Sequence, residues 1–249
     1  MAIRTDIQDH IGEVVLDHPP VNALDSKAWN ELADVIGRIG TQAQVRCVLL
    51  RGEGKGFCAG VDLKEMQQHP ERIVDLNRGN FRTFRAVRAC EVPVVTAAHG
   101  FIIGGGIGIC GASDVVIAAE DAYFSLPEID RGAMGGASHL SRMLPLHKVR
   151  AAFFTGGRIP AAEAYRLGAV EQVVPAKSLL KDARAFAAVI AEKSRRALVL
   201  AKEALNGIEA RDVDRDYRFE QGFTLEMYLH EDSQKARDAF VKDKKSAKY

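Results

Sequence analysis

The sequence has few residues that cross-link a chain or bind a metal ion. Its four cysteines form no CxxC pair, and they lie in apolar or glycine-rich surroundings: Cys47, Cys58, Cys90 and Cys110. A disulfide-stabilised domain has a dense cysteine framework instead, so we expect buried, reduced thiols. The seven histidines show no HExxH or other short metal-ligand spacing, and none pairs with a cysteine as a zinc site requires. The sequence predicts no metal.

The chain also lacks an excess of charge of one sign and any long apolar run. Its 34 basic and 33 acidic residues leave a formal net charge of +1, which predicts neither general binding of nucleic acid nor attraction to an anionic membrane. The first residues alternate charged and apolar side chains, unlike a signal peptide. No later apolar run reaches the roughly 20 residues that span a bilayer. We therefore expect a cytoplasmic protein that recognises its partner locally.

The hydrophobic pattern predicts an α/β fold with a mainly helical second half. Short β-branched runs alternate with longer amphipathic ones, so strands are expected at 13–16, 46–50, 92–96, 114–118 and 122–125, and helices at 26–39 and 71–90. From about Gly135 the strand signal fades, and helices are expected at 161–168, 177–192, 196–206 and 214–229. The basic tail 236–249 either packs on a neighbouring subunit or, as composition favours, is solvated.

Two glycine-rich stretches each follow an expected strand. Residues 104–111 can crowd several backbone amides at the start of a helix, where unpaired N–H groups and the helix dipole bind negative charge. The second stretch, residues 52–66, places further exposed amides at another strand end. One loop near Gly60 and one near Gly105 would supply two N–H donors to one oxygen, which is the geometry of an oxyanion hole.

Two other interpretations of residues 104–111 remain open at this point. The glycines can serve only close helix packing. The stretch from Gly106 to Gly111 also matches the GxGxxG dinucleotide fingerprint, with Glu128 or Asp130 about 20 residues on. A dinucleotide site expects the acidic residue at the end of the second strand of a first βαβ unit, whereas Asp130 precedes another glycine-rich stretch.

Glu128 is the carboxylate that the sequence singles out. It follows Pro127 and lies between apolar residues, where burial would raise its pKa towards a value useful for proton transfer at neutral pH. An isolated glutamate in such a loop is more often solvated. Its role therefore depends on what surrounds it in space.

Four ordered segments together carry a resemblance that spans essentially the whole chain: GFCAGVDLKEM, HGFIIGGGIGI, SDVVIAAEDAYFSLPEI and GGRIPAAEAYRLGAVEQVV. In this order and spacing they resemble the crotonase superfamily of enoyl-CoA hydratases and isomerases. The resemblance implies a spiral of repeated ββα units over residues 1–190. It also implies a C-terminal helical region, residues 191–249, that mediates homotrimers and often dimers of trimers.

The resemblance also implies the substrate and the site. The substrate would be an acyl-CoA thioester, and no cofactor would be needed because coenzyme A is part of the substrate. The oxyanion donors would be the backbone N–H groups of Val61 and Gly105, and Glu128 would be catalytic. Phe240 matches a residue that reaches a neighbour's nucleotide. The substrate-binding residues implied are Ala59, Val61, Asp62, Leu63, Lys64, Gly104, Gly105 and Phe240.

One position departs from the hydratase pattern. Hydratases of this superfamily add water with two glutamates, and the position that matches the first is Gly108 here, whereas the second is retained as Glu128. Loss of one positioned acid or base typically costs about 10² to 10⁴ in rate. We therefore expect poor hydration of a short enoyl-CoA, and we expect Gly108 to leave room for a bulkier acyl group.

Further segments are similar to a narrower branch that opens the last rings in sterol degradation by hydrolysing a carbon–carbon bond of a CoA thioester: PPVNALDSKAW, GGGIGICGASDV, RGAMGGASHLSR, AKEALN and YRFEQGFT. Water would then be activated by Glu128 or by His139, which lies near an expected helix start. Three functions stay open. They are an enoyl-CoA hydratase/isomerase-like enzyme, which we favour here, a ring-opening CoA hydrolase, and a non-catalytic acyl-CoA binder.

Overall fold

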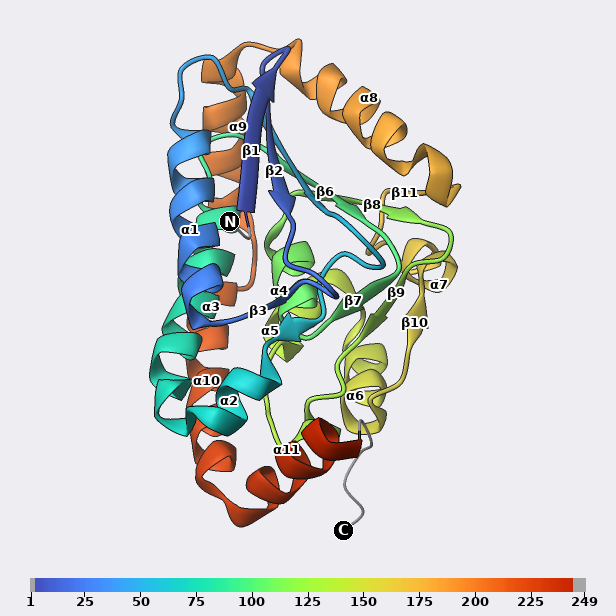
Figure 1. Cartoon of the computed structure of the whole chain (residues 1–249). Helices are drawn as coiled ribbons and strands as arrows, with labels where there is room; N and C mark the ends of the chain where they lie inside the picture. Colours follow the sequence, from blue (N-terminus) through green and yellow to red (C-terminus); the bar gives the residue numbers. More distant parts are fainter. Residues whose placement is uncertain (1–2, 244–249) are drawn as a thin grey trace.

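The computed structural model describes residues 3–243 and is built around a six-stranded sheet (Figure 1). The strand order is β1-β2-β4-β6-β8-β11. Only β1 runs antiparallel to its neighbour, and the other pairs are parallel. The strands are β1 (Ile3–Gln8), β2 (Ile11–Leu16), β4 (Cys47–Gly52), β6 (Val94–Ala98), β8 (Val115–Ala119) and β11 (Gln172–Val174).

Shorter strands follow those of the large sheet: β3 (Ala23–Leu24), β5 (Gly60–Val61), β7 (Phe101–Ile103), β9 (Tyr123–Ser125) and β10 (Ile159–Pro160). β3 pairs with β5 and β7 with β9, both in parallel. The backbone N–H of Ile103 donates to the Cys58 carbonyl at 2.9 Å and joins the two pairs. β2, β4, β6 and β8 are thus each followed by a short strand, and the short strands of successive units lie side by side. This arrangement is the predicted spiral of repeated ββα units.

Helices separate the successive strand pairs and form the C-terminal region. They are α1 (Ser26–Gly40), α2 (Leu63–Gln68), α3 (Ile73–Arg88), α4 (Gly105–Ala112), α5 (Ala137–Met143), α6 (Leu146–Thr155), α7 (Ala161–Arg166), α8 (Leu179–Ala191), α9 (Arg195–Ile208), α10 (Val213–Leu229) and α11 (Glu231–Asp243), with the short 3₁₀ turns η1 (Pro70–Arg72), η2 (Ile129–Arg131) and η3 (Ala176–Ser178). α1 illustrates why such segments form helices. The Asp25 side chain accepts a hydrogen bond from the Ala28 N–H and so caps the N-terminus of α1. Its residues Trp29, Leu32 and Ile36 lie three or four positions apart and are buried.

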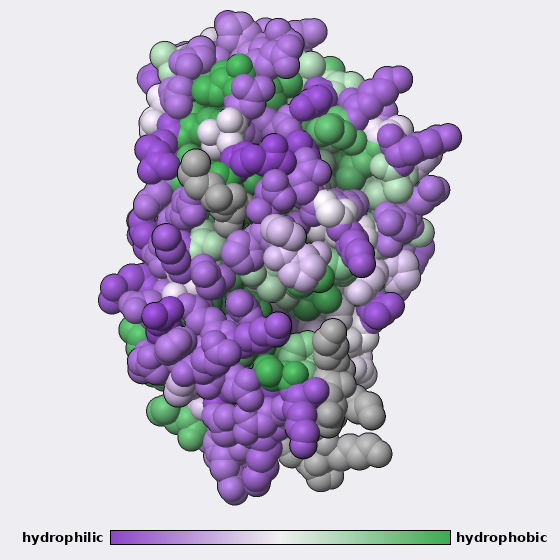
Figure 2. Space-filling model, in the orientation of Figure 1, coloured by the Kyte–Doolittle hydropathy of each residue, from purple (hydrophilic) through white to green (hydrophobic). Residues whose placement is uncertain are grey.

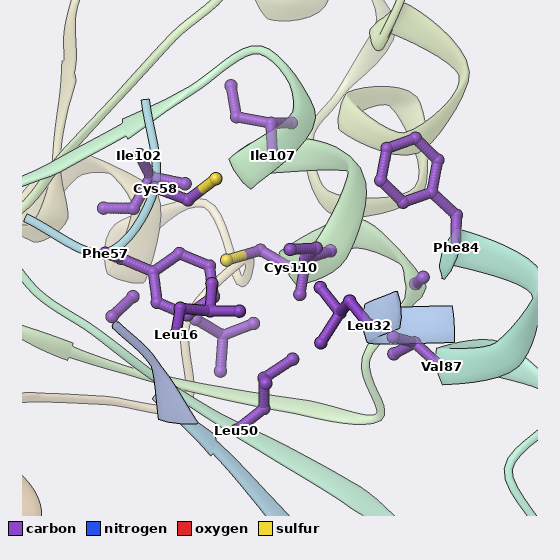
Figure 3. Close-up of a cluster of buried hydrophobic side chains, with 14 of the residues drawn as sticks. Leu16, Leu32, Leu50, Phe57, Cys58, Phe84, Val87, Ile102, Ile107 and Cys110 are labelled. Carbon is purple, nitrogen blue, oxygen red and sulfur yellow. The ribbon is translucent and has the colours of Figure 1, made fainter. Parts of the chain in front are cut away.

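The two faces of the large sheet are covered by different helices (Figure 1). α8 packs on one face through small residues such as Ala183 and Ala187, against Leu49 and Val95. The main core lies on the other side, between the sheet and α1, α3 and α4. Figure 3 shows part of this core, where the Cys58 and Cys110 side chains lie among apolar side chains. All four cysteines are free and buried, as expected.

The second half departs from the sequence expectation in three places. β10 and β11 lie beyond Gly135, where the strand signal fades. Strands of two or three residues are too short to show an alternating pattern. The tail is not solvated where it is described, since α11 packs on the chain itself and Ala236 is fully buried. Residues 244–249 of the predicted tail lie outside the described residues.

The C-terminal helices are joined to the first part of the chain by buried contacts. The Lys202 ammonium on α9, which is 3% exposed, donates to the carbonyls of Val87 and Val92 and to the Asp114 carboxylate at 2.7 Å. The division near residue 190 stays a prediction. Among the described helices, none combines the length and apolar character that crossing a membrane requires. Figure 2 shows a face covered mainly by hydrophilic residues, with small separate hydrophobic patches.

Candidate active site

Successive turns of the spiral end at the same edge. Val61 ends β5, Gly104 follows β7 directly, and Glu128 follows β9 after two residues. β5 and β7 are linked through the Cys58–Ile102 bridge, and β7 pairs with β9, all in parallel. Because parallel strands point the same way, their carboxyl ends meet. Three positions that are far apart in the sequence therefore surround one space.

The two glycine-rich loops present backbone N–H groups to this space. Gly105 is the first residue of α4, and its N–H has no acceptor within residues 3–243. Gly60 has a φ of +85°, and a Cβ there would lie 3.2 Å from the Gly105 nitrogen, so the loops are in close contact. The Asp62 N–H donates to the Leu24 carbonyl, so the preceding N–H of Val61 points the opposite way, away from β3.

The Glu128 carboxyl group lies against the start of α4. A Cβ on Gly104 would collide with the Glu128 Oε1 atom, so the glycine permits this close approach. The Oε2 atom is buried and has no hydrogen-bond partner in the described chain. Burial raises the pKa of Glu128 to about 8; the negative charge of Glu220 adds to this rise and Arg131 opposes it. The carboxyl group is therefore suited to exchange protons near neutral pH.

These groups line one largely apolar cavity of about 120 Å³. Its apolar wall includes Leu63, Met66, Ile73, Leu76, Met134 and Tyr228. Among the described residues that line it, Glu128 is the only carboxylic acid. Nowhere in residues 3–243 do three or more His, Cys, Asp or Glu side chains come together as metal ligands would. An apolar cavity with a few convergent polar groups is the usual form of a small-molecule site.

The structure brings together most of the residues predicted for the site. The cavity is lined by Ala59, Val61, Leu63, Gly104, Gly105 and Glu128. Four others do not line it: Asp62, Lys64, Phe240 and His139. The Asp62 side chain accepts from the Lys64 N–H as N-cap of α2, and Lys64 is exposed. The Phe240 ring lies under the Arg131 guanidinium, 3.6 Å from centroid to Cζ.

The space beside Gly108 is filled, contrary to expectation. A Cβ at Gly108 would lie 2.6 Å from Cε2 of the Phe84 ring, and Phe84 itself lines the cavity. Figure 3 shows this side chain, which comes from α3, near the α4 residues Ile107 and Cys110. Gly108 therefore provides room for an aromatic side chain of the protein, and the expectation of room for a bulkier acyl group was wrong at this position.

His139 does not line the cavity. It is 1% exposed, and its ring packs against Phe84 and Tyr217, with centroids 4.7 and 4.9 Å away. Both of these aromatic residues line the cavity. Burial lowers the pKa of His139 to about 3, with Arg142 and Arg88 adding to the effect, so the ring is neutral at physiological pH. The structure thus places His139 behind the aromatic wall.

Sequence reasoning missed three charged residues near the cavity. Glu220 on α10 accepts from the N–H groups of Ala137 and Ser138 at 2.8 and 3.1 Å and so caps α5. Arg131 and Arg237 line the cavity. Arg131 follows Glu128 by three residues, a spacing that pointed to the same site. Glu220 and Arg237 come from distant helices, and no local pattern marks them.

Comparison with known proteins agrees with this fold. Residues 6–249 match the family model described as enoyl-CoA hydratase/isomerase. Two similar proteins are named (7aS)-7a-methyl-1,5-dioxo-2,3,5,6,7,7a-hexahydro-1H-indene-carboxyl-CoA hydrolase. The one from Mycobacterium tuberculosis is 50% identical, and the match covers 92% of this chain and 94% of the relative. The one from Rhodococcus jostii is 48% identical, and the match covers 94% of this chain and 91% of the relative. A crystal structure of an enoyl-CoA hydratase/isomerase from Xanthobacter autotrophicus Py2 has a TM-score of 0.90 at 24% identity and covers 98% of this chain and 94% of its own.

The class defined by the spiral and its cavity is that of the crotonase-fold enzymes. The chain belongs to the enoyl-CoA hydratase/isomerase family of this superfamily.

Proposed function

We propose that this enzyme hydrolyses a carbon–carbon bond beside a ring ketone in a cyclic oxoacyl-CoA thioester. The observation that carries the proposal is the 50% identity, over nearly the whole of both chains, with a hydrolase whose name specifies a bicyclic dioxo carboxyl-CoA substrate. Coenzyme A would enter as part of the substrate. The reaction would therefore consume only water besides the thioester.

The site geometry supports this proposal over hydration. Family hydratases would need a second glutamate where Gly108 stands, and Phe84 leaves no space for one. Glu128 is the only carboxylic acid among the described cavity residues, and its raised pKa suits it to take a proton from water. His139 is separated from the cavity by its aromatic neighbours, so Glu128 is our candidate for activating water.

The proposed reaction places each group in a defined role. Glu128 takes a proton from water, and the hydroxide oxygen adds to the ring ketone carbon. The carbon–carbon bond then breaks, and its electron pair is delocalised to the thioester oxygen as an enolate. The N–H groups of Val61 and Gly105 would stabilise that oxygen. The enolate carbon takes this proton back from Glu128, and the former ketone carbon becomes a carboxylic acid, which loses its proton to water and leaves a carboxylate.

An isomerase-type reaction is the second candidate. A single carboxyl group can remove a proton from one carbon of an enoyl thioester and return it to another, with the enolate held by the same two N–H groups. The lone Glu128 in an apolar cavity is the observation that favours it. This reaction leaves the mass of the thioester unchanged.

The test is an activity screen in water labelled with heavy oxygen. The unmodified protein is incubated with a bicyclic dioxo carboxyl-CoA, a 2-oxocycloalkane carboxyl-CoA, crotonyl-CoA and a 3-enoyl-CoA, and the products are followed by mass spectrometry. We expect a cyclic ester to gain one water with label in a new carboxylate. An unchanged mass with a shifted double bond would favour isomerisation. Efficient labelling of crotonyl-CoA as a hydroxyacyl product, or tight binding without any turnover, would contradict the proposal.

We further propose that the protein forms a homotrimer or a dimer of trimers through its C-terminal helices. Apolar side chains exposed on α9 and α10 support this proposal: Leu205 at 63%, Ile208 at 77% and Phe219 at 71%. Exposed apolar patches of this kind commonly mark protein interfaces. Sedimentation velocity of the full chain, with Phe219→Glu as the disrupting variant, tests it; a monomeric unmodified protein would contradict it.

A further inference from the structure

Two arginines reach the active-site cavity from different elements. Arg131 ends the 3₁₀ turn η2, three residues after Glu128, and Arg237 lies on α11. Both line the cavity. Arg237 is only 3% exposed, and the Nε atoms of both side chains are buried without a hydrogen-bond partner in the described chain. Two cations therefore face a space whose wall is otherwise largely apolar.

Neither arginine forms an ion pair within residues 3–243. Arg131 makes no side-chain hydrogen bond there. Arg237 donates only to neutral groups, the Ser233 hydroxyl and the Gln234 side-chain oxygen. A buried cation without a counter-charge is costly, so such a residue usually meets its anion in a ligand or a partner. Burial lowers the pKa of both guanidinium groups; the charges of Asp130 and Glu128 near Arg131, and of Asp238 near Arg237, oppose this without forming an ion pair.

Aromatic rings hold both guanidinium groups by their faces. The Arg131 Cζ lies 3.6 Å from the Phe240 ring centroid, and the Arg237 Cζ lies 3.9 Å from that of Tyr228. A planar guanidinium that stacks on a ring keeps its N–H edges free for a planar acceptor. The two side chains belong to one junction, because the Ser233 hydroxyl bonds to the Gly132 carbonyl and joins η2 to α11.

We propose that Arg131 and Arg237 together bind a carboxylate carried by the acyl group, at the opposite end from the thioester. The inference rests on the proposed function, in which hydrolysis of a ring ketone creates this carboxylate. A guanidinium matches a carboxylate in a bidentate manner, and charge-assisted hydrogen bonds are about twice as strong as neutral ones. Before the bond breaks, the same N–H groups would hold the ketone oxygen.

The phosphates of coenzyme A are a competing source of negative charge. Arg237 is 3% exposed and contacts Tyr228, whose hydroxyl donates to the Met66 carbonyl beside the apolar wall. The cavity is lined mainly by apolar residues, which suit an acyl group better than a nucleotide. The position of the arginines therefore favours the acyl carboxylate, and the test is arranged to separate the two sources.

The experiment measures binding, so it does not depend on turnover. Dissociation constants of the full chain are determined by calorimetry for two thioesters of equal chain length, hexanoyl-CoA and adipoyl-CoA, which differ only in the terminal carboxylate. We expect the unmodified protein to prefer adipoyl-CoA by about tenfold or more. Arg131→Gln and Arg237→Gln should each remove most of this preference and leave the affinity for hexanoyl-CoA nearly unchanged.

Controls separate the proposal from loss of folding and from phosphate binding. Arg150→Gln is the matched variant, because Arg150 also lies over an aromatic ring, Phe154, but does not line the cavity; its preference should be unaltered. Arg131→Gln breaks no side-chain hydrogen bond, so it keeps the test valid if Arg237→Gln unfolds. Equal loss of affinity for both thioesters would assign the arginines to the coenzyme A phosphates. No preference in the unmodified protein would overturn the proposal, even if ring hydrolysis is observed.

Discussion

Two neighbouring helices of this enzyme begin in the same way, but their first N–H groups differ in whether a side chain accepts from them. α4 begins after Gly104 and α5 after Gly136, both with positive φ, and a Cβ on Gly136 would lie 3.8 Å from the Gly104 carbonyl oxygen. The start of α5 is filled by the carboxylate of Glu220, whereas the first N–H of α4 faces the cavity. Because a helix start attracts negative charge, the start of α4 is our proposed position for a substrate oxygen.

The two buried glutamates, Glu220 and Glu128, likewise differ in their hydrogen-bond partners. Glu220 accepts from two N–H groups and the Ser138 hydroxyl; burial raises its pKa as well, but these hydrogen bonds oppose the rise. Glu128 has no partner for its buried Oε2 atom, and burial raises its pKa to about 8. Hydrogen bonds to a carboxylate favour the charged form, and burial without them favours the neutral form. Glu220 is thus held by hydrogen bonds, whereas Glu128 is our proposed group for proton transfer.

The largest expected effect is that of Glu128→Gln. The substitution keeps the shape and removes the titrating group, so kcat on the best substrate should fall by about 10² to 10⁴ if proton transfer limits the rate. Steady-state kinetics on that substrate measure it. Glu226→Gln, at an exposed position of α10, is the control and should leave kcat unchanged. Full turnover by Glu128→Gln would remove the proposed distinction between the two glutamates.

The next largest expected effect is that of Gly105→Ala, at the uncapped start of α4. A Cβ at Gly105 would lie 2.6 Å from Cζ2 of Trp29, so Gly105→Ala must displace the first turn of α4. Loss of one oxyanion donor costs about 2.7 to 4 kcal/mol, or 10² to 10³ in kcat. Gly37→Ala serves as control, because nothing lies within 4 Å of a Cβ there. Melting temperatures show whether each variant folds, and a folded Gly105→Ala with normal kcat would argue against the oxyanion role.

The difference between the helix starts could be predicted only in part. The loops near Gly60 and Gly105 and the carboxylate of Glu128 were recognised because each lies in a compact local motif. The partner of the α5 start was not, because Glu220 lies 83 residues from Ala137 and is brought there by the packing of α10. The filling of the Gly108 space by Phe84 was missed for the same reason.

The length of two strands and the composition of α11 explain the other differences between the predicted and the observed fold. β10 and β11 have two and three residues, too few for a period-two pattern. α11 is rich in charged residues, so its composition suggested a solvated tail, whereas in the fold Ala236 and Arg237 are buried. The alternation of β-branched and amphipathic runs predicted only an α/β fold; the spiral was implied by the resemblance to the crotonase superfamily.

We expect a smaller effect from Glu220→Gln, which changes the cap of α5 and lowers the folding stability. The glutamine amide group would turn one N–H₂ donor towards the donors of α5, so one buried donor loses its acceptor, at a cost of about 1 to 3 kcal/mol. Urea unfolding at fixed pH measures this loss of stability. The variant should also lower the pKa of Glu128, because the negative charge of Glu220 raises it. The inflection of kcat/KM against pH should then move to lower pH; an unmoved inflection would show that the two glutamates are not coupled.

The smallest expected effect is the pH dependence of folding stability due to Glu128. Its folded pKa of about 8 lies above the ordinary value of 4.5, so its contribution is fully present below pH 4.5 and is lost as pH rises towards 8. His139, with a pKa lowered from 6.5 to about 3, acts in the opposite direction and loses its contribution as pH falls below 6.5. Since His139 is present in both the variant and the unmodified protein, its effect cancels when the two are compared between pH 6.5 and 8. Between these two pH values, Glu128→Gln should gain at least about 1 kcal/mol of unfolding free energy relative to the unmodified protein, the worth of a single pKa unit. Urea midpoints at the two pH values give the difference. Parallel midpoints for variant and unmodified protein would mean that the Glu128 carboxyl is ionised and solvated in the folded chain, and the contrast with Glu220 would then disappear.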